Sequence, residues 1–422
     1  MSHLFFTLFC LSSLLVLGNA CSTANKQKEE KTKKEKPREE KPREDKPQAN
    51  KPVPPSSSTP PLENYSPPPG KEFDLVRKAL HDVDTTLASL QSVITPKQVV
   101  GLKNCGNTCF INAVLQVLLN TDYLRRYFTH SPNPVINHSN DDAAKITKAF
   151  VQLFHNYYAE PARRFIDTKA FIALKDAHLW QFEPGEQGDA DEFWRVLGTN
   201  LHEALNVMEQ KIPYQTLNDS QQADFPWLKA YLIGREGHSL FSRVIVPYVK
   251  KTVTCESGSS NIFYSPGNFP MQVTLGKSSQ ALPELLTEAE EWEFNIAGAT
   301  CSDKSKVTKK KEEIAELPPA PGYVAFQLKR FSATQDSSGK MQYKKVETPL
   351  HFPLQFTFKG KLLSLYGVIL HSGSFKAGHY TSYVTNADNH WYYCNDETVS
   401  SVQVEQVLAD QKKAYLLFYK ID

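Results

Sequence analysis

Hydrophobic and polar positions divide the chain into three parts. Residues 1–21 contain an almost unbroken apolar run, residues 22–72 are rich in Lys, Glu and Pro, and the remainder shows periodic apolar positions. Residues 73–94 carry apolar side chains at helical spacing, beginning with Leu75, Ala79 and Leu80, which predicts an amphipathic helix. We expect this helix to pack on the domain that follows; pairing with a copy of itself is the alternative.

Residues 95–422 are predicted to form one globular domain. Its first half has helical spacing, in the helix that contains Cys109 and over residues 144–158 and 189–208. Its second half reads as strands, over residues 241–253, 323–331, 365–371, 379–385, 391–394 and 414–421. Helices followed by a largely antiparallel sheet indicate an α+β domain, with the chemistry expected in the cleft between the two halves.

The N-terminal parts predict a membrane anchor and a spacer. The apolar run is short for a membrane span of about 20 residues and slightly long for the core of a signal peptide. Lysines begin directly after it, at Lys26 and Lys28, and such a flank is typical of the cytoplasmic side. We therefore predict a membrane partner and a cytosol-facing domain, separated by a disordered linker over residues 22–72. A cleaved signal and a secreted protein are the alternative.

Charge and cysteine content limit the partners and cofactors. A formal net charge of +2 gives no reason to expect nucleic acid as a partner. The 7 cysteines are odd in number and include no C-x-x-C pair, which disfavours a disulfide framework and a four-thiolate zinc site. We expect reduced surroundings, no metal and no cofactor.

The stretch GLKNCGNTCFINAVLQVLLN, residues 101–120, contains the candidate nucleophile. Apolar residues from Phe110 onward recur on one helix face, and Gly106, Asn107 and Thr108 before them favour a turn and a cap. Cys109 is thus expected in the first helical turn, where unpaired N–H groups and the helix dipole favour a thiolate. A small buried cysteine without chemistry is the alternative.

A cysteine nucleophile needs a base, a group that orients the base, and donors for the oxyanion. The candidate base is His379 in AGHYTSYV, and Asn395 or Asp396 in WYYCNDETV could orient its imidazole. Asn104 could donate its side-chain N–H to the oxyanion together with the backbone N–H of Cys109. The alternatives are an Asx turn for Asn395 and Asp396, and a plain loop residue for Asn104.

The stretch QGDADEFWRVL, residues 187–197, supplies a candidate binding site for a basic substrate. In a helix, Asp189 and Glu192 share one face, and two carboxylates there suit a substrate that carries arginines. Acidic residues that merely stabilise a helix N-terminus are the alternative, and both roles are compatible.

Five motifs occur in the order found in the ubiquitin-specific proteases: GLKNCGNTCFINAVLQ, QGDADEF, LKRF, GHYTSY and WYYCND. The chain resembles that family over roughly residues 96–422. The resemblance implies a papain-like thumb and palm with antiparallel β fingers, and hydrolysis of the bond after the C-terminal glycine of ubiquitin. It implies Cys109 as nucleophile, His379 as base, Asn395 as third member and Asn104 as oxyanion donor. It also implies that Asp189 and Glu192, with Gln187 beside them, bind the tail of ubiquitin.

Several positions depart from the family pattern. Gly188 replaces a commonly larger polar residue, and the fingers carry single cysteines, Cys255 and Cys301, where many members have C-x-x-C pairs for zinc. Two thiolates cannot complete a tetrahedral zinc site, so zinc-free fingers are predicted, with a mobile, Lys-rich tip over residues 301–313.

Two other functions are compatible with these residues. They are a protease for another ubiquitin-like modifier and a non-catalytic ubiquitin-binding module on the same fold. A ubiquitin hydrolase behind a secretion-like N-terminus also raises the alternative of a bacterial effector that acts in a host cell.

Overall fold

The computed structural model describes residues 66–422, except for 91–98, 131–135, 138–140, 160–162, 177–181, 183–184, 209, 277, 291–292, 295–300, 302–304, 336–340, 375–376 and 387. The predicted apolar segment 1–21 and most of the predicted linker 22–72 lie outside the described residues. Within the described part, no helix is long and apolar enough to cross a bilayer. The prediction of a membrane-anchored protein is therefore corrected, and no membrane partner is assigned.

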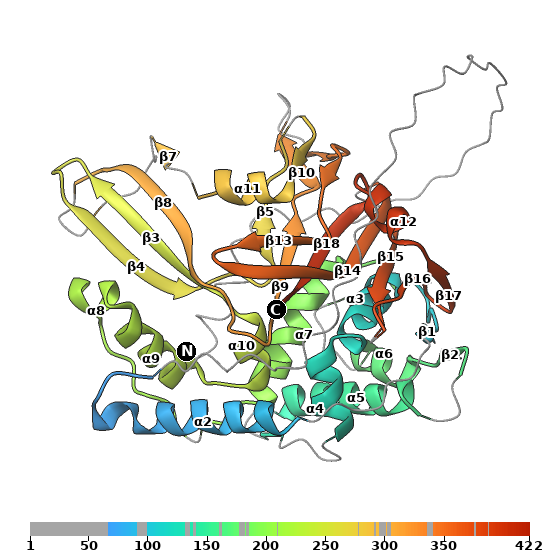
Figure 1. Cartoon of the computed structure of the whole chain (residues 1–422), viewed down its shortest axis with the longest axis horizontal. Coiled ribbons are helices and arrows are strands. Elements are labelled where there is room, and N and C mark those ends of the chain that lie inside the picture. Colours follow the sequence, from blue (N-terminus) through green and yellow to red (C-terminus); the bar gives the residue numbers. More distant parts are fainter. Residues whose placement is uncertain are drawn as a thin grey trace. The chain divides into compact units, whose positions relative to one another are not determined.

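Helices form most of the first half of the described chain, and the segment 73–94 does contain a helix. The helices are η2 (Lys71–Phe73), α2 (Asp74–Ser89), α3 (Cys109–Leu119), α4 (Asp122–His130), α5 (Asp141–Tyr157), α6 (Lys169–Asp176), α7 (Ala190–Ala204), α8 (Asp219–Ala223), α9 (Phe225–Glu236), α10 (Leu240–Ile245), α11 (Leu282–Glu288) and α12 (Val404–Ala409). Every residue of α3 is buried, because this helix lies between other helices and the sheet (Figure 1). The nucleophile candidate thus starts a helix that is fixed on all sides.

An eight-stranded sheet forms the second half and packs on α3 (Figure 1). Its order is β17-β16-β15-β14-β18-β9-β5, with β13 also paired to β14, and all pairs are antiparallel except β5–β9. The strands are β5 (Met271–Val273), β9 (Gly322–Leu328), β13 (Gln355–Phe358), β14 (Lys361–Gly373), β15 (Gly378–Thr385), β16 (Trp391–Asn395), β17 (Thr398–Val402) and β18 (Ala414–Ile421). The expected α+β arrangement with a largely antiparallel sheet is confirmed.

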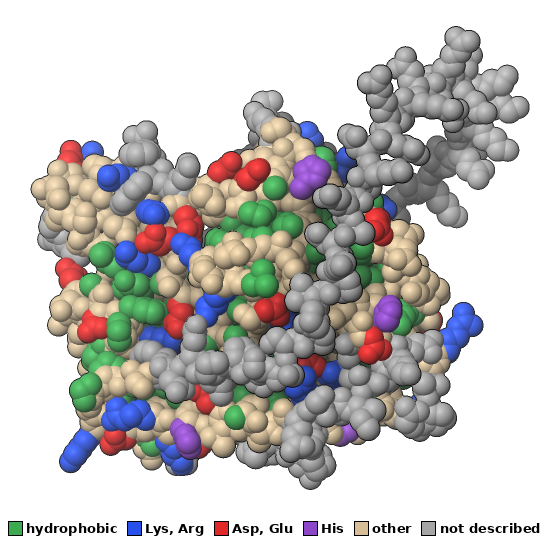
Figure 2. Space-filling model, viewed as in Figure 1, with side chains coloured by type: hydrophobic (Ala, Val, Ile, Leu, Met, Phe, Trp, Pro, Cys, Tyr) green, Lys and Arg blue, Asp and Glu red, His purple; other side chains and the backbone are tan. Residues whose placement is uncertain are grey.

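A second sheet, of order β4-β3-β8-β7, corresponds to the predicted fingers. Its strands are β3 (Tyr248–Cys255), β4 (Ser260–Pro266), β7 (Glu293–Phe294) and β8 (Val307–Glu316). Ion pairs join β3 to β8, including Lys250–Glu313 at 3.2 Å and Lys251–Glu312 at 3.1 Å. Basic and acidic side chains accordingly lie interspersed on the surface in Figure 2. The fingers are therefore a polar sheet, held by backbone ladders and ion pairs more than by a core.

Three short pairs complete the described strands. They are β1 (Gly101–Leu102) with β2 (Phe165–Ile166), β6 (Gln280–Ala281) with β12 (Leu350–His351), and β10 (Phe331–Gln335) with β11 (Met341–Lys345). The first pair anchors the start of the stretch 101–120, directly before the turn that leads to Cys109.

Two sequence-based assignments in this region are corrected. Residues 241–253 were predicted as one strand, but the first part is helix α10, whose N-cap Ser239 forms a capping box with Ser242. Local capping there outweighs the β-branched composition of the segment. Residues 301–313 were predicted as a mobile tip, yet β8 begins at Val307 and pairs with β3 along its length.

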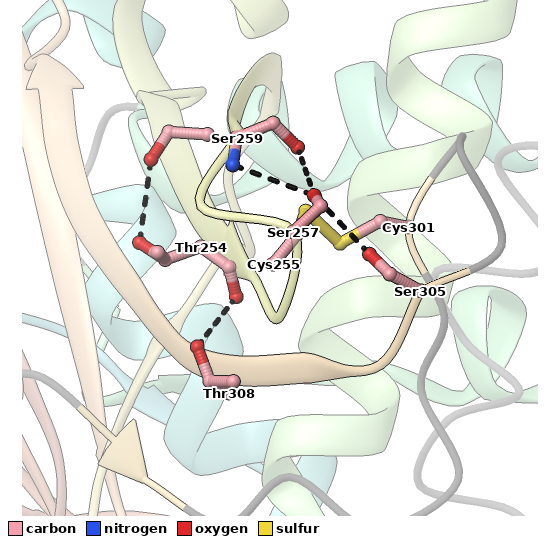
Figure 3. Close-up of a disulfide and its surroundings, with 8 residues drawn as sticks. Thr254, Cys255, Ser257, Ser259, Cys301, Ser305 and Thr308 are labelled. Atoms are coloured by element: carbon pink, nitrogen blue, oxygen red, sulfur yellow. Dashed lines mark hydrogen bonds between the residues drawn. A yellow bond between two sulfur atoms is a disulfide. The ribbon is translucent and has the colours of Figure 1, made fainter.

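The prediction of unpaired finger cysteines is also wrong. Cys255 and Cys301 form a disulfide, with their Cα atoms 6.2 Å apart (Figure 3). Around it, Ser305 Oγ donates to Ser257 Oγ at 3.4 Å, and Thr308 Oγ1 donates to the Thr254 carbonyl at 3.0 Å (Figure 3). The absence of C-x-x-C pairs did not exclude a bridge, because cysteines 46 positions apart in sequence meet at the end of the β3–β8 ladder.

Helix α2 packs on the domain, as predicted. Phe73 and Val76 are almost fully buried and belong to a hydrophobic cluster with Leu228 and Tyr231 of α9. Asp84 of α2 accepts a 2.9 Å hydrogen bond from Arg243 of α10. Through α9, which contacts β4, this helix supports the base of the fingers.

Candidate active site

Cys109 opens helix α3, at the position that the capping residues predicted. Its side chain is 3% exposed, and α3 packs directly against strand β15. Burial raises the pKa of the Cys109 thiol, and the negative charge of Asp396 adds to this, whereas hydrogen bonds with the backbone of Tyr380 and Phe110 oppose it. The helix N-terminus is expected to favour a thiolate, but burial and Asp396 outweigh this effect, so the thiol needs the predicted base.

His379 lies on β15, next to Tyr380, whose backbone contacts the Cys109 thiol. Its Nε2 lies 2.7 Å from Oδ1 of Asn395, the last residue of β16. An amide oxygen only accepts, so Nε2 carries the proton and Nδ1 is the unprotonated nitrogen of the neutral ring. Asn395, rather than Asp396, therefore contacts the imidazole.

Asp396 is turned away from His379 and toward the Cys109 stretch. It is the first residue of the two-residue turn between β16 and β17 and has a φ of 49°. Its carboxylate accepts hydrogen bonds from Nδ2 of Asn104 and Nδ2 of Asn112, each at 2.8 Å. Its backbone carbonyl accepts from the N–H of Leu102 at 2.9 Å. Asp396 thus links the β16–β17 turn to the segment 102–104 before the turn and to Asn112 of α3 after it.

The amide of Asn104 is fixed at both ends. Its Oδ1 accepts from the N–H of Gly106 at 2.9 Å, and its Nδ2 donates to Asp396. The backbone N–H of Asn104 donates to Oε1 of Glu397 at 3.0 Å. This network assigns the amide orientation, and it leaves one of the two Nδ2 hydrogens outside the bond to Asp396.

The carboxylate of Asp189 has several donors. It caps α7 by accepting from the N–H groups of Asp191 and Glu192, at 2.8 and 3.3 Å. The hydroxyl of Tyr415 donates to it at 2.7 Å, and that of Tyr380 at 3.4 Å. No local sequence pattern indicates these two tyrosines, because they reach the helix cap from the distant strands β15 and β18.

The remaining residues of the acidic stretch differ in environment. Glu192 is half-buried in the first turn of α7, the helix that Asp189 caps. Asp191 is buried and pairs with Arg195 at 2.6 Å; burial raises the pKa of Asp191 to about 7. At Gly188, an added Cβ would lie 2.6 Å from the ring of Phe110, so the ring packing requires glycine there.

The structure therefore brings these predicted site residues together at the N-termini of α3 and α7. Cys109, His379, Asn395, Asp396 and Asn104 surround the N-terminus of α3, and Asp189 joins them through Tyr380, the residue after His379. Among the described residues, no cluster of three or more His, Cys, Asp or Glu side chains could hold a metal ion.

A family model described as ubiquitin carboxyl-terminal hydrolase matches residues 100–419 of the sequence. The chain belongs to this family. The matched segment contains every residue of the candidate active site, and it begins after helix α2.

Curated relatives include ubiquitin carboxyl-terminal hydrolase 21 of Homo sapiens, which is 28% identical over 365 residues. That match covers 76% of this chain and 61% of the relative. The ubiquitin carboxyl-terminal hydrolase Usp2 of Drosophila melanogaster is 29% identical over 335 residues. That match covers 76% of this chain and 34% of the relative. The chain thus matches about a third to three fifths of the length of these relatives.

Solved structures show the same fold. A SAGA DUB module of Ubp8, Sgf11, Sus1 and Sgf73 bound to monoubiquitin matches with a TM-score of 0.59 at 20% identity, over 83% of this chain and 76% of that chain. The corresponding module bound to ubiquitin aldehyde gives a TM-score of 0.57 at 22% identity, over 82% of this chain and 74% of that chain.

Proposed function

We propose that this chain is a deubiquitinating cysteine protease that hydrolyses the peptide or isopeptide bond after the C-terminal glycine of ubiquitin. Family membership supports the reaction class. The single observation that carries the assignment of residues is the 2.7 Å contact between His379 and Asn395, since the next residue on the strand, Tyr380, forms a backbone hydrogen bond with the Cys109 thiol. We infer that the catalytic domain spans residues 95–422 and that α2 is a support outside the family core.

In the proposed reaction, His379 Nδ1 takes the Cys109 proton and the thiolate attacks the scissile carbonyl carbon. The C–N bond then breaks, and the imidazolium gives its proton to the departing amine. Water, activated by the same imidazole, hydrolyses the thioester and restores the thiol. Asn395 accepts from Nε2 throughout, which keeps the tautomer correct and the ring oriented.

The oxyanion that forms in the first step needs donors. The backbone N–H of Cys109 and the second Nδ2 hydrogen of Asn104 are the candidates. Asp396 holds Asn104 in this orientation. We therefore propose that Asp396 positions the oxyanion donor Asn104 and does not position His379.

Asp189 and Glu192 are proposed to bind the arginines of ubiquitin's tail. A carboxylate pair favours arginine because the guanidinium binds it bidentately. The hydroxyls of Tyr415 and Tyr380 fix the Asp189 carboxylate in advance, and such preorganisation lowers the entropic cost of binding.

The test is hydrolysis of a ubiquitin C-terminal amide by the wild type and by Cys109→Ala. We expect turnover only in the wild type, while both proteins bind ubiquitin, because the thiol supplies bond making rather than contact area. Full activity of Cys109→Ala would contradict the nucleophile assignment. Binding without turnover in the wild type would support a non-catalytic module, and a panel of other modifiers with the same leaving group tests the substrate.

A further inference from the structure

Gln187 and Gly378 form a reciprocal pair of hydrogen bonds. Nε2 of Gln187 donates to the Gly378 carbonyl at 2.8 Å, and the Gly378 N–H donates to Oε1 of Gln187 at 3.1 Å. Both ends of the side-chain amide are therefore engaged by one backbone residue. Gln187 precedes helix α7, Gly378 starts β15, and 191 positions separate them in the sequence.

This pair replaces a missing part of the sheet. Strand β15 pairs with β14 from Gly378 onward, but its other neighbour, β16, pairs with it only from Ser382 to Thr385. The start of β15, which includes His379, thus has no β16 partner on that edge. The amide of Gln187 offers Gly378 one donor and one acceptor, as a neighbouring strand would.

A face of the sheet at Gly378 is covered as well. A Cβ added there would lie 2.1 Å from Nε2 of His371, so the imidazole of His371 lies against the glycine. Lys345 Nζ donates to the carbonyls of His371 and Gly373, at 2.8 and 3.2 Å, which holds the end of β14. The backbone before His379 is consequently fixed between β14 and Gln187.

We propose that Gln187 is a positioning residue for His379: its amide replaces the strand neighbour that β15 lacks and keeps the imidazole aligned between Cys109 and Asn395. This inference rests on the proposed function in one respect, the role of His379 as the base of Cys109. The expectation that Gln187 contacts the tail of ubiquitin stays a separate prediction, because the second Nε2 hydrogen of the amide lies outside the bond to Gly378.

The two roles predict different kinetics. Gln187→Met keeps the side-chain length and removes both hydrogen bonds. If Gln187 positions His379, Gln187→Met should lower kcat by about tenfold or more with little change in KM. If Gln187 contacts the ubiquitin tail, the substitution should raise KM at constant kcat. Gln187→Glu retains only the acceptor for the Gly378 N–H, so we expect an intermediate kcat.

The decisive readout needs no ubiquitin. Iodoacetamide alkylates thiolates, so the rate of Cys109 alkylation against pH, followed on the Cys109 peptide by mass spectrometry, reports how well His379 stabilises the thiolate. In the wild type we expect the profile to lie at lower pH than in His379→Ala, because an adjacent imidazolium offsets the burial that raises the pKa of the Cys109 thiol. In Gln187→Met the profile should shift to higher pH, with a rate at pH 7 reduced about tenfold.

Gln152→Met is the matched control, since Gln152 is exposed on α5 and its Nε2 donates to Asn156 on the same helix. It should retain the wild-type profile. A wild-type alkylation profile in Gln187→Met, or a raised KM alone, would overturn the proposal. Identical alkylation profiles of the wild type and His379→Ala would instead contradict the Cys109–His379 pair, and with it the proposed function.

Discussion

The carboxylate of Asp396 accepts a 2.8 Å hydrogen bond from Nδ2 of Asn104, a residue 292 positions earlier in the sequence. Its neighbour Asn395 faces the other way and contacts the imidazole of His379. Two adjacent residues, one at the end of β16 and one in the turn after it, thus serve two different parts of the site. Asn395 orients the base, and Asp396 orients the candidate oxyanion donor.

Substitutions at these two residues should therefore reduce kcat for different reasons. Asn395→Ala removes the acceptor for His379 and should lower kcat by about 100-fold or more, whereas Asn395→Asp keeps an acceptor oxygen and should retain much of the activity. Asp396→Ala releases Asn104 and should cost about 10- to 100-fold, less than the full loss of an oxyanion donor. The measurement is kcat of all three variants on one ubiquitin substrate at fixed pH.

Asn104→Ala and Asp396→Ala share one mechanism, so their combination should cost little more than Asn104→Ala alone. Additive losses in that double variant would show that Asp396 acts independently of Asn104. If Asp396→Ala is inactive while Asn395→Ala is nearly unaffected, then Asp396, and not Asn395, is the third catalytic member beside Cys109 and His379.

Asp189→Asn separates the two roles of that side chain. Asn is as good an N-cap as Asp, so the melting temperature should stay close to that of the wild type, but the negative charge is lost. We expect kcat/KM on ubiquitin substrates to fall by about 10- to 100-fold. Unchanged kcat/KM at unchanged stability would restrict Asp189 to capping α7.

The order of helices and sheet could be predicted from periodicity. The motifs selected the residues that the structure gathers around the N-terminus of α3, and their catalytic roles stay predictions. What the sequence could not indicate were contacts between distant segments. The hydroxyl of Tyr415 reaches Asp189 only because β18 lies beside β14 in the sheet, and Cys301 meets Cys255 only because β8 pairs with β3. The strand predicted over residues 241–245 is wrong for a local reason, because capping by Ser239 outweighs their strand-like composition.

The disulfide should determine how well the fingers are ordered. By the chain-entropy estimate, closing a loop of 46 residues restricts the unfolded ensemble by about 4 kcal/mol. In a Cys109→Ala background, which removes the reactive thiol, a dithiol reductant should weaken ubiquitin binding about tenfold, because the fingers lose preorganisation.

The variant that also carries Cys255→Ser and Cys301→Ser is the control for this measurement. Its Kd should equal that of the reduced protein and should not respond to the reductant. Equal affinities of the oxidised and reduced Cys109→Ala proteins would show that the disulfide has no part in ubiquitin binding.

His238 should make the fold sensitive to acid. Burial, together with the positive charge of Arg243, lowers the pKa of His238 in the folded state to about 3, so the unfolded chain binds its proton first as pH falls below about 6.5. This residue therefore favours folding less as pH decreases, by about 2 kcal/mol between pH 7 and pH 5. His202 is buried beside it and behaves alike, with a pKa lowered to about 4.

Chemical denaturation of wild type and His238→Gln at pH 7 and pH 5 measures this contribution. The variant should lose about 2 kcal/mol less free energy of unfolding on acidification. A comparison between the two proteins isolates His238 from Asp191, whose raised pKa acts in the opposite direction. Equal losses in both proteins would show that His238 titrates normally in the fold.

The central claim, that Cys109 is a nucleophile aimed at the C-terminus of ubiquitin, is tested most directly by ubiquitin carrying a C-terminal electrophile. Mass spectrometry of the product identifies the modified cysteine. We predict one covalent ubiquitin per chain, attached to Cys109, with no adduct on Cys105 and none in Cys109→Ala. A folded wild-type protein that forms no adduct, or one whose adduct lies on another cysteine, would contradict the account.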